Sequence, residues 1–269
     1  MPKVKLTDFT LAYELRGAGL PLLFIHGYPL NRHLWQAQLV GLSDAARSLS
    51  PDLRGHGDST SGSAAHSMHQ LAQDCFELIT LLGITQPFVV CGLSMGGYIA
   101  MAMLRIHPKS VAGLILTATR STADTPEVKA SRDKSIQLAQ QEGSGPIIEA
   151  MLPRLLSPKT LASHPELTSQ AKHIMASISV STIVKDLQGL KERPDSTSLL
   201  AALTQPTLII HGADDQIVPL AEAQALQKTI PGAQLVVLPA AGHLPNLEQP
   251  SLFNDAVRQF LKSIPNEQK

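Results

Sequence analysis

Short apolar runs alternate with segments of helical periodicity along most of the chain. The strands that this pattern predicts lie at residues 3–7, 10–16, 22–25, 48–51, 88–91, 111–117, 207–210 and 234–238. Continuous apolar runs of this length, such as residues 88–91, are typical of strands buried on both faces. Amphipathic segments such as residues 68–82 lie between several of the strands. The alternation therefore predicts an α/β fold with a mostly parallel twisted sheet and helices on both of its faces.

One long segment interrupts the alternation. Residues 121–195 contain no good strand pattern and are rich in Ser, Gln, Lys and Pro. Helices are expected to begin after residues 124–127, 145–146 and 164–166, where a proline falls in what would be the first helical turn. We therefore expect a core domain formed by residues 1–120 and 196–269, with a helical insertion at residues 121–195.

A G-x-S-x-G motif occupies residues 92–96, directly after an apolar run and directly before a helical pattern that starts at Met95. A strand, a sharp turn at a serine and a helix form the context of a nucleophile elbow. Gly92 and Gly96 provide the room that such a turn needs, and Ser94 is expected in a strained conformation with its hydroxyl exposed. Short motifs of this kind also occur in ordinary strand–helix turns. A catalytic role for Ser94 therefore depends on whether the chain also provides a base and an acid for it.

A serine hydroxyl becomes a nucleophile at neutral pH only with a base and an orienting acid. Asp214 and Asp215 follow the predicted strand at residues 207–210, and His243 lies in a glycine-containing loop after the last predicted strand. Loops at the carboxyl ends of parallel strands form the ligand sites of open α/β sheets. The chain order Ser, Asp, His is the one found in α/β-hydrolases. Adjacent side chains at a strand end point to opposite sides, so only one of the two aspartates is expected to face His243.

With these motifs the sequence resembles the α/β-hydrolases of the capped, cofactor-independent esterase and lactonase type. These include 3-oxoadipate enol-lactonases, bacterial carboxylesterases and non-haem haloperoxidases that act as perhydrolases. The resemblance spans nearly the whole chain and includes His26-Gly27-Tyr28-Pro29 and the D-L-R-G-H-G-D-S segment at residues 52–59. It implies an α/β-hydrolase fold in which the insertion caps the serine.

The resemblance also implies roles for individual residues. Ser94 is the expected nucleophile, His243 the base, and Asp215, four residues before Pro219, the triad acid. The backbone N–H groups of Tyr28 and Met95 are the expected oxyanion hole. His26 is expected to brace the loop that carries Tyr28, whose own side chain either enters the pocket or covers its mouth. Part of the pocket lining is expected among the apolar residues of the insertion, which are Ile136, Ile147, Ile148, Met151, Leu152, Ile174, Met175 and Ile178.

The predicted activity is hydrolysis of carboxylic esters with small to medium acyl or alcohol groups through an acyl-enzyme. A serine nucleophile excludes the haloalkane dehalogenases and epoxide hydrolases of this fold, which use aspartate. Lactonase and perhydrolase activities would use the same triad, and a ligand sensor or signalling protein with little turnover would also keep it. Arg120, where the insertion begins, either pairs with an acid in the hinge, as we expect, or binds a carboxylate of the substrate.

Composition narrows the expected partners. The 22 Lys and Arg residues balance 22 Asp and Glu residues, and the chain contains no basic block, so binding to nucleic acid or to an acidic membrane is not expected. Cys75 and Cys91 are expected to be small buried residues, and His66 and His69 lack further ligands for a metal site. We expect a cytoplasmic enzyme that acts on a small-molecule ester or lactone without cofactor or metal. Both a monomer and a homodimer are compatible with the sequence.

Overall fold

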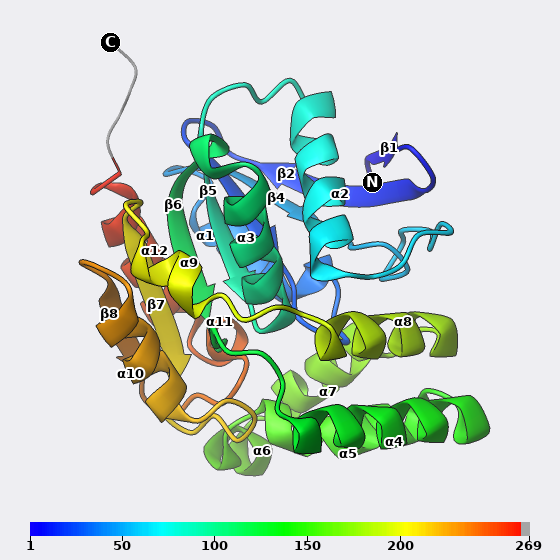
Figure 1. Ribbon diagram of the computed structural model, residues 1–269. Coiled ribbons are helices and arrows are strands. Elements are labelled where there is room, and N and C mark those ends of the chain that lie inside the picture. The colour runs from blue at the N-terminus through cyan, green and yellow to red at the C-terminus, as the bar shows by residue number, and fades with distance from the viewer. Residues whose placement is uncertain (265–269) are drawn as a thin grey trace.

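The computed structural model describes residues 1–264 and contains one eight-stranded sheet (Figure 1). The strands are β1 (Lys3–Lys5), β2 (Thr10–Arg16), β3 (Pro21–Ile25), β4 (Arg47–Pro51), β5 (Phe88–Leu93), β6 (Val111–Thr117), β7 (Thr207–Gly212) and β8 (Gln234–Leu238). They lie in the order β1-β2-β4-β3-β5-β6-β7-β8. The β1–β2 and β2–β4 pairs are antiparallel and all other pairs are parallel. The predicted mostly parallel sheet is confirmed.

Helices cover both faces of this sheet, as Figure 1 shows. Helices α2 (Met68–Leu81) and α3 (Met95–Ile106) lie on one face, and α1 (Gln36–Gly41) and α12 (Pro250–Leu261) lie on the other. Helix α12 buries Phe253, Val257 and Phe260, which recur at the spacing of a single helical face. Trp35 is fully buried between Phe24 of β3 and Phe253, with ring centroids 4.8 Å and 5.9 Å away. These apolar contacts fix the helices against the strands that carry the candidate site.

Residues 121–195 form helices and connecting turns only. The helices are α4 (Pro126–Glu142), α5 (Gly145–Leu155), α6 (Pro158–Ser163), α7 (Pro165–Met175) and α8 (Val180–Lys191). The helix starts predicted near residues 126, 146 and 165 are confirmed, with a proline in the first turn of each. We call these five helices the cap. They lie together beyond the carboxyl ends of the parallel strands, at the bottom of Figure 1.

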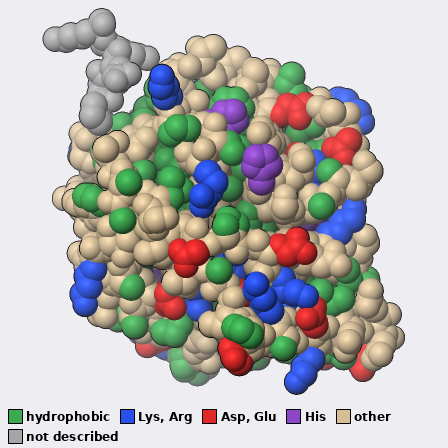
Figure 2. Space-filling model, in the orientation of Figure 1, with side chains coloured by type: hydrophobic (Ala, Val, Ile, Leu, Met, Phe, Trp, Pro, Cys, Tyr) green, Lys and Arg blue, Asp and Glu red, His purple; other side chains and the backbone are tan. Residues whose placement is uncertain are grey.

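The remaining helices complete the core. Helix α9 (Thr197–Ala201) leads from the cap to β7, α10 (Leu220–Thr229) packs on β7 and β8, and α11 (Pro245–Glu248) precedes α12. Within residues 1–264 no helix combines the length and apolar character that a membrane span requires. Cys75 and Cys91 are both buried and unpaired. On the face in Figure 2, positive and negative side chains are interspersed, most densely over the cap.

Candidate active site

Ser94 occupies a sharp turn between β5 and α3. Its φ of 53° and ψ of −111° are costly for a residue with a side chain and persist only where the surroundings hold them. The backbone N–H of Ser94 donates to the carbonyl oxygen of Thr117 on β6 at 2.8 Å. A Cβ at Gly92 would lie 2.1 Å from the carbonyl oxygen of Gly96, so the turn requires glycine there. The predicted strand–turn–helix geometry at Ser94 is therefore present.

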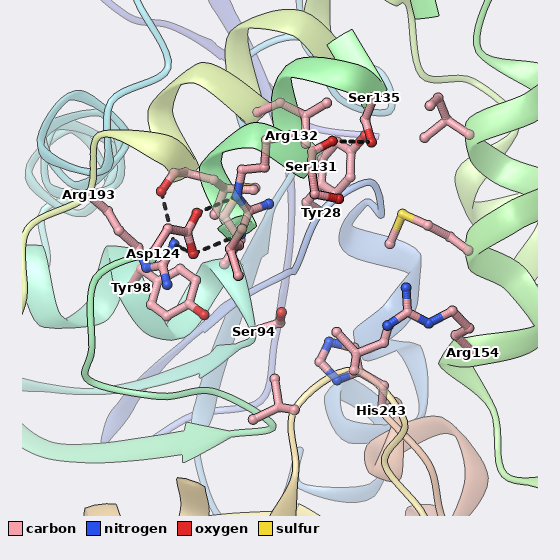
Figure 3. A pocket seen from close by; sticks show the side chains of 18 of the residues that line it. Tyr28, Ser94, Tyr98, Asp124, Ser131, Arg132, Ser135, Arg154, Arg193 and His243 are labelled. Atoms are coloured by element: carbon pink, nitrogen blue, oxygen red, sulfur yellow. Dashed lines mark hydrogen bonds and ion pairs between the residues drawn. The ribbon is translucent and has the colours of Figure 1, made fainter. Parts of the chain in front are cut away.

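The Ser94 side chain points into a cavity of about 530 Å³ between the cap and the carboxyl edge of the sheet (Figure 3). Tyr28, Met95 and His243 line the same cavity. Of the eight apolar cap residues among which lining was expected, only Ile147 and Met151 reach it. The apolar lining also includes residues that the sequence did not single out, namely Val128, Leu138, Ala150, Leu187, Leu190, Ile217 and Val218.

His243 is joined to Asp215. The Nδ1 atom of His243 lies 2.8 Å from Oδ2 of Asp215, whose side chain is fully buried. The other carboxylate oxygen of Asp215 accepts hydrogen bonds from the backbone N–H groups of Ile217 and Val218 at 2.8 Å and 2.9 Å. Burial would raise the pKa of Asp215, but His243 and these donors outweigh it, so the pKa lies below the ordinary Asp value. This carboxylate stays charged beside the imidazole.

Asp214 has different surroundings. It is exposed, and its backbone N–H donates to the carbonyl oxygen of Ala241 at 2.9 Å. Of the two adjacent aspartates, the structure thus brings Asp215, the acid that the resemblance implies, to His243.

His211 is a site neighbour that sequence reasoning missed. Its Nε2 lies 3.6 Å from Oδ2 of Asp215 and donates to the carbonyl oxygen of Val218 at 2.9 Å. Burial lowers the pKa of His211, which keeps the ring neutral. The sequence does place His211 four residues before the candidate acid, in the strand that leads to it, and this spacing could have indicated that the two side chains are neighbours. The neutral ring therefore lies beside the Asp215 carboxylate without forming a charged pair with it.

The expected oxyanion loop follows β3 and passes beside Ser94. A Cβ at Gly27 would lie 3.3 Å from Cβ of Ser94. Met95 is the first residue of α3, where backbone N–H groups have no partner within the helix. The N–H groups of Tyr28 and Met95 therefore belong to two segments that meet next to the serine, as an oxyanion hole requires.

The side chain of Tyr28 is buried and lines the cavity, and it does not cover the cavity mouth. The residue is 9% exposed, and its hydroxyl has no hydrogen-bond partner within residues 1–264. Burial raises the pKa of Tyr28 well above its ordinary value. The neutral hydroxyl is therefore available to a bound ligand as donor or acceptor.

His26 braces the loop that carries Tyr28. Its Nδ1 lies 3.0 Å from the carbonyl oxygen of Gly27, and its Nε2 accepts a hydrogen bond from the N–H of Leu53 at 3.1 Å. A carbonyl only accepts, so Nδ1 carries the proton and the ring is neutral. Burial, together with the charge of the nearby His56, lowers the pKa of His26 to about 3. His26 is thus placed as a fixed support for the loop.

Charged side chains line the cap side of the cavity. They are Arg120, Asp124, Glu127, Arg132, Arg154 and Arg193, four arginines against two carboxylates. Nη1 of Arg193 lies 2.6 Å from Oδ1 of Asp124, and Arg132 pairs with the same carboxylate. Arg193 also lies over the ring of Tyr98, 4.1 Å from its centroid. This network ties the start of α4 to the end of α8.

Of two further cavity arginines, one has an anionic partner and the other has none within the described residues. Arg120 pairs with Glu222 at 3.4 Å, so the expected ion pair is present, but its acid lies in α10 of the core and not in the hinge. Arg154 donates to the carbonyl oxygen of Gln216 at 3.3 Å, and no ion pair within residues 1–264 involves it. Figure 3 shows its guanidinium on the His243 side of the cavity. Arg154 is therefore a cation without an anionic partner beside the candidate site.

Comparison with known proteins defines the class of the chain. A model of the alpha/beta hydrolase fold family matches residues 21–250. The chain belongs to this family, which confirms the predicted fold class.

Relatives of this chain include an enol-lactonase and an esterase. The 3-oxoadipate enol-lactonase 2 of Acinetobacter baylyi is 30% identical over 95% of this chain and 94% of that protein. A thermophilic esterase from Thermogutta terrifontis, solved with malate bound, is 41% identical with a TM-score of 0.95, over 99% of this chain and 100% of that one. The enol-lactonase from Burkholderia xenovorans is 25% identical with a TM-score of 0.89, over 97% of this chain and 100% of that one. The chain is thus a hydrolase-family enzyme with esterase and lactonase relatives.

Proposed function

We propose that this protein hydrolyses carboxylic esters through an acyl-enzyme formed on Ser94. The observation that carries the proposal is the placement of Ser94 and His243 on one cavity, with His243 Nδ1 2.8 Å from the buried carboxylate of Asp215. With its Nδ1 proton held by that carboxylate, His243 has Nε2 free to accept the proton of Ser94. The nucleophile and the base of the proposed reaction therefore line the same cavity, and the acid is held behind the base.

In the first step, Ser94 Oγ attacks the ester carbonyl while His243 takes its proton. The N–H groups of Tyr28 and Met95 donate to the oxyanion of the tetrahedral intermediate. His243 then gives the proton to the leaving alcohol, which leaves Ser94 acylated. In the second step, water attacks the acyl carbonyl, His243 takes a proton from the water, and Ser94 regains that proton as the carboxylic acid departs.

Repeated turnover distinguishes this function from that of a triad-bearing ligand sensor. The test is hydrolysis of p-nitrophenyl acetate at a large excess of substrate over protein. We expect many equivalents of p-nitrophenol per Ser94 at a constant rate. Release of a single equivalent followed by a halt would indicate a sensor that becomes acylated once.

A second candidate is hydrolysis of an ester or lactone that itself carries a carboxylate. Arg154 favours it, because this guanidinium lies beside His243 without an anionic partner, and arginine binds carboxylates with paired donors. The relatives named as enol-lactonases and the esterase solved with malate point to the same chemistry. Lactone opening and perhydrolysis would proceed on the same triad.

Replacing Arg154 by glutamine is expected to separate acidic from neutral substrates. We expect kcat/KM to fall about five- to tenfold for monoethyl succinate, in line with a partly solvated charge-assisted contact. Ethyl butyrate, which lacks the free carboxylate, serves as the matched substrate, and its kcat/KM should change less than twofold. Equal losses for both esters, or none for either, would remove Arg154 from substrate recognition.

Met151 is expected to limit acyl-chain length. Its side chain lines the cavity from α5, and pocket methylenes discriminate between substrates by about 1–3 kcal/mol. Met151→Ala should therefore raise the ratio of kcat/KM for p-nitrophenyl octanoate over butyrate about tenfold. Leu252→Ala on the exposed side of α12 is the control and should leave the ratio unchanged. An unchanged ratio in both variants would place chain-length selection outside the cap.

A further inference from the structure

A buried charged cluster joins the cap to the core away from Ser94. Asp186 of α8 is fully buried; its Oδ1 lies 2.6 Å from Nδ1 of His66, and its Oδ2 lies 3.0 Å from Nε2 of His56. Both histidines belong to the segment between β4 and α2, under which α8 lies in Figure 1. The sequence had left His66 without a role, because its partner is in the cap.

The same face of α8 makes two more close contacts with this segment. Thr182 Oγ1 donates to the carbonyl oxygen of Gly55 at 3.0 Å. A Cβ at Gly189 would lie 2.0 Å from the carbonyl oxygen of His66, so the helix approaches that backbone closely. Thr182, Asp186 and Gly189 recur at the i, i+4, i+7 spacing of one helical face. Helix α8 is thus docked through polar groups with defined partners.

The groups that face the two ring nitrogens of His56 require this imidazole to be positively charged. Its Nδ1 lies 3.0 Å from the carbonyl oxygen of Arg54, which only accepts, so Nδ1 carries a proton. Its Nε2 faces the Asp186 carboxylate as an ion pair whose atoms are not aligned as a hydrogen bond. A neutral ring would direct a lone pair at a buried carboxylate oxygen 3.0 Å away. The imidazolium instead gives a cluster in which one positive and one negative charge compensate each other.

The electrostatic surroundings agree with this charge. Burial lowers the pKa of His56, but the Asp186 carboxylate outweighs it, and the pKa lies above the ordinary His value. Burial raises the pKa of Asp186, but His56 outweighs it, and that pKa lies below the ordinary Asp value. The other ionisable groups near His56 are His66, the ring of His26, and Asp52, which pairs with Arg32.

His56 links Asp186 to the oxyanion loop. The ring centroids of His56 and His26 are 4.8 Å apart, and His26 holds the Gly27 carbonyl and the Leu53 N–H. Asn31, shortly after Tyr28, donates from its side chain to the Ile174 carbonyl of α7 at 2.8 Å. The loop that carries Tyr28 is therefore supported by the cap from two sides.

We propose that Asp186 is a positioning residue for ester hydrolysis. When the cap is docked, Asp186 holds His56 in place, and His56 in turn supports His26 and the oxyanion loop. Asp186 itself does not line the cavity, although the next residue, Leu187, does, and the Asp186 carboxylate faces His56 and His66 instead. Loss of the Asp186 charge is therefore expected to act on the stabilisation of the oxyanion and not on substrate binding. This positioning role rests on the proposed function, whereas the ion pair between Asp186 and His56 does not.

The ion pair also predicts a pH dependence. Because the pKa of His56 is raised in the folded state, its stabilisation is complete below the unfolded value of about 6.5 and is lost as pH rises through the folded-state value. Deprotonation would leave two acceptors facing each other next to the oxyanion loop. We therefore expect kcat of the wild-type enzyme to decline on the alkaline side.

The test is Asp186→Asn, which keeps the shape of the side chain and removes its charge. We expect kcat for p-nitrophenyl acetate to fall about 10- to 100-fold with KM changed less than about threefold, as for a small displacement of oxyanion donors. The alkaline decline should disappear, because His56 is then neutral throughout. Asp133→Asn is the matched control, since Asp133 forms an exposed ion pair with Lys191 on the cap surface, and it should leave kcat and the pH profile unchanged.

If Asp186 has a merely structural role, Asp186→Asn should have a lower melting temperature. Well below that temperature, its kcat and the alkaline decline of kcat should then be those of the wild type. This result would overturn the proposal. Imidazole ¹⁵N chemical shifts of the wild type at pH 7, assigned with His56→Gln, show whether His56 is cationic even if Asp186→Asn does not fold. A cationic His56 supports the inference and a neutral His56 overturns it. If the wild type hydrolyses no ester, the proposed function fails, whereas the ¹⁵N result still decides the ion pair.

Discussion

Ester turnover is expected to fall at least about 10³-fold when Ser94 is replaced by alanine, the scale of loss when a triad serine is removed. The side chain makes the covalent bond in the proposed mechanism, and the oxyanion donors alone recover only a small part of the rate. The check is kcat for p-nitrophenyl acetate under saturating substrate.

The fold of Ser94→Ala is expected to be intact. Both residues carry a Cβ, so the positive φ of 53° costs alanine about as much as serine. Circular dichroism and the melting temperature provide the control. A folded variant that keeps turnover within tenfold of the wild type would show that another group carries the chemistry.

Asp215→Asn is expected to lower kcat by up to about 10⁴-fold, roughly 5 kcal/mol of transition-state stabilisation. The asparagine amide would donate toward His243 Nδ1, where the carboxylate now accepts at 2.8 Å. The imidazole would then carry its proton on Nε2, the atom that must accept the proton of Ser94. Steady-state kinetics on a p-nitrophenyl ester measures this loss.

Asp214→Asn is the matched control, since it makes the same chemical change at the neighbouring position. Asp214 is exposed, so we expect its replacement to cost less than about tenfold in kcat. A larger loss at Asp214 than at Asp215 would overturn the assignment of the acid and leave the pairing of Ser94 with His243 untouched.

The fold was predictable from the sequence because its signals are local. Buried parallel strands such as β5 and β7 are continuous apolar runs, and the turn at Ser94 needs glycines that the sequence displays directly. The prolines that begin α4, α5 and α7 mark the cap in the same way. Such features act within a few residues, so a pattern in the chain is enough to find them.

Contacts between distant segments were less predictable. Which apolar cap residues line the cavity depends on how α4, α5 and α7 rotate against the core. Leu138 of α4 was therefore missed, whereas Ile174 and Met175 of α7 are buried away from the cavity. Arg120 was expected to pair within the hinge, but its acid is Glu222, far along the chain. Asp186 and His56 belong to different parts of the molecule, and only the docking of α8 brings them together.

The most direct test of the central claim is detection of the acyl-enzyme. The wild type would be mixed with p-nitrophenyl butyrate, quenched with acid during turnover, digested and analysed by mass spectrometry. Our account predicts a butyryl adduct on the peptide that contains Ser94, and its absence from Ser94→Ala treated in the same way. Sustained hydrolysis with no adduct, or with an adduct on a residue other than Ser94, would contradict it.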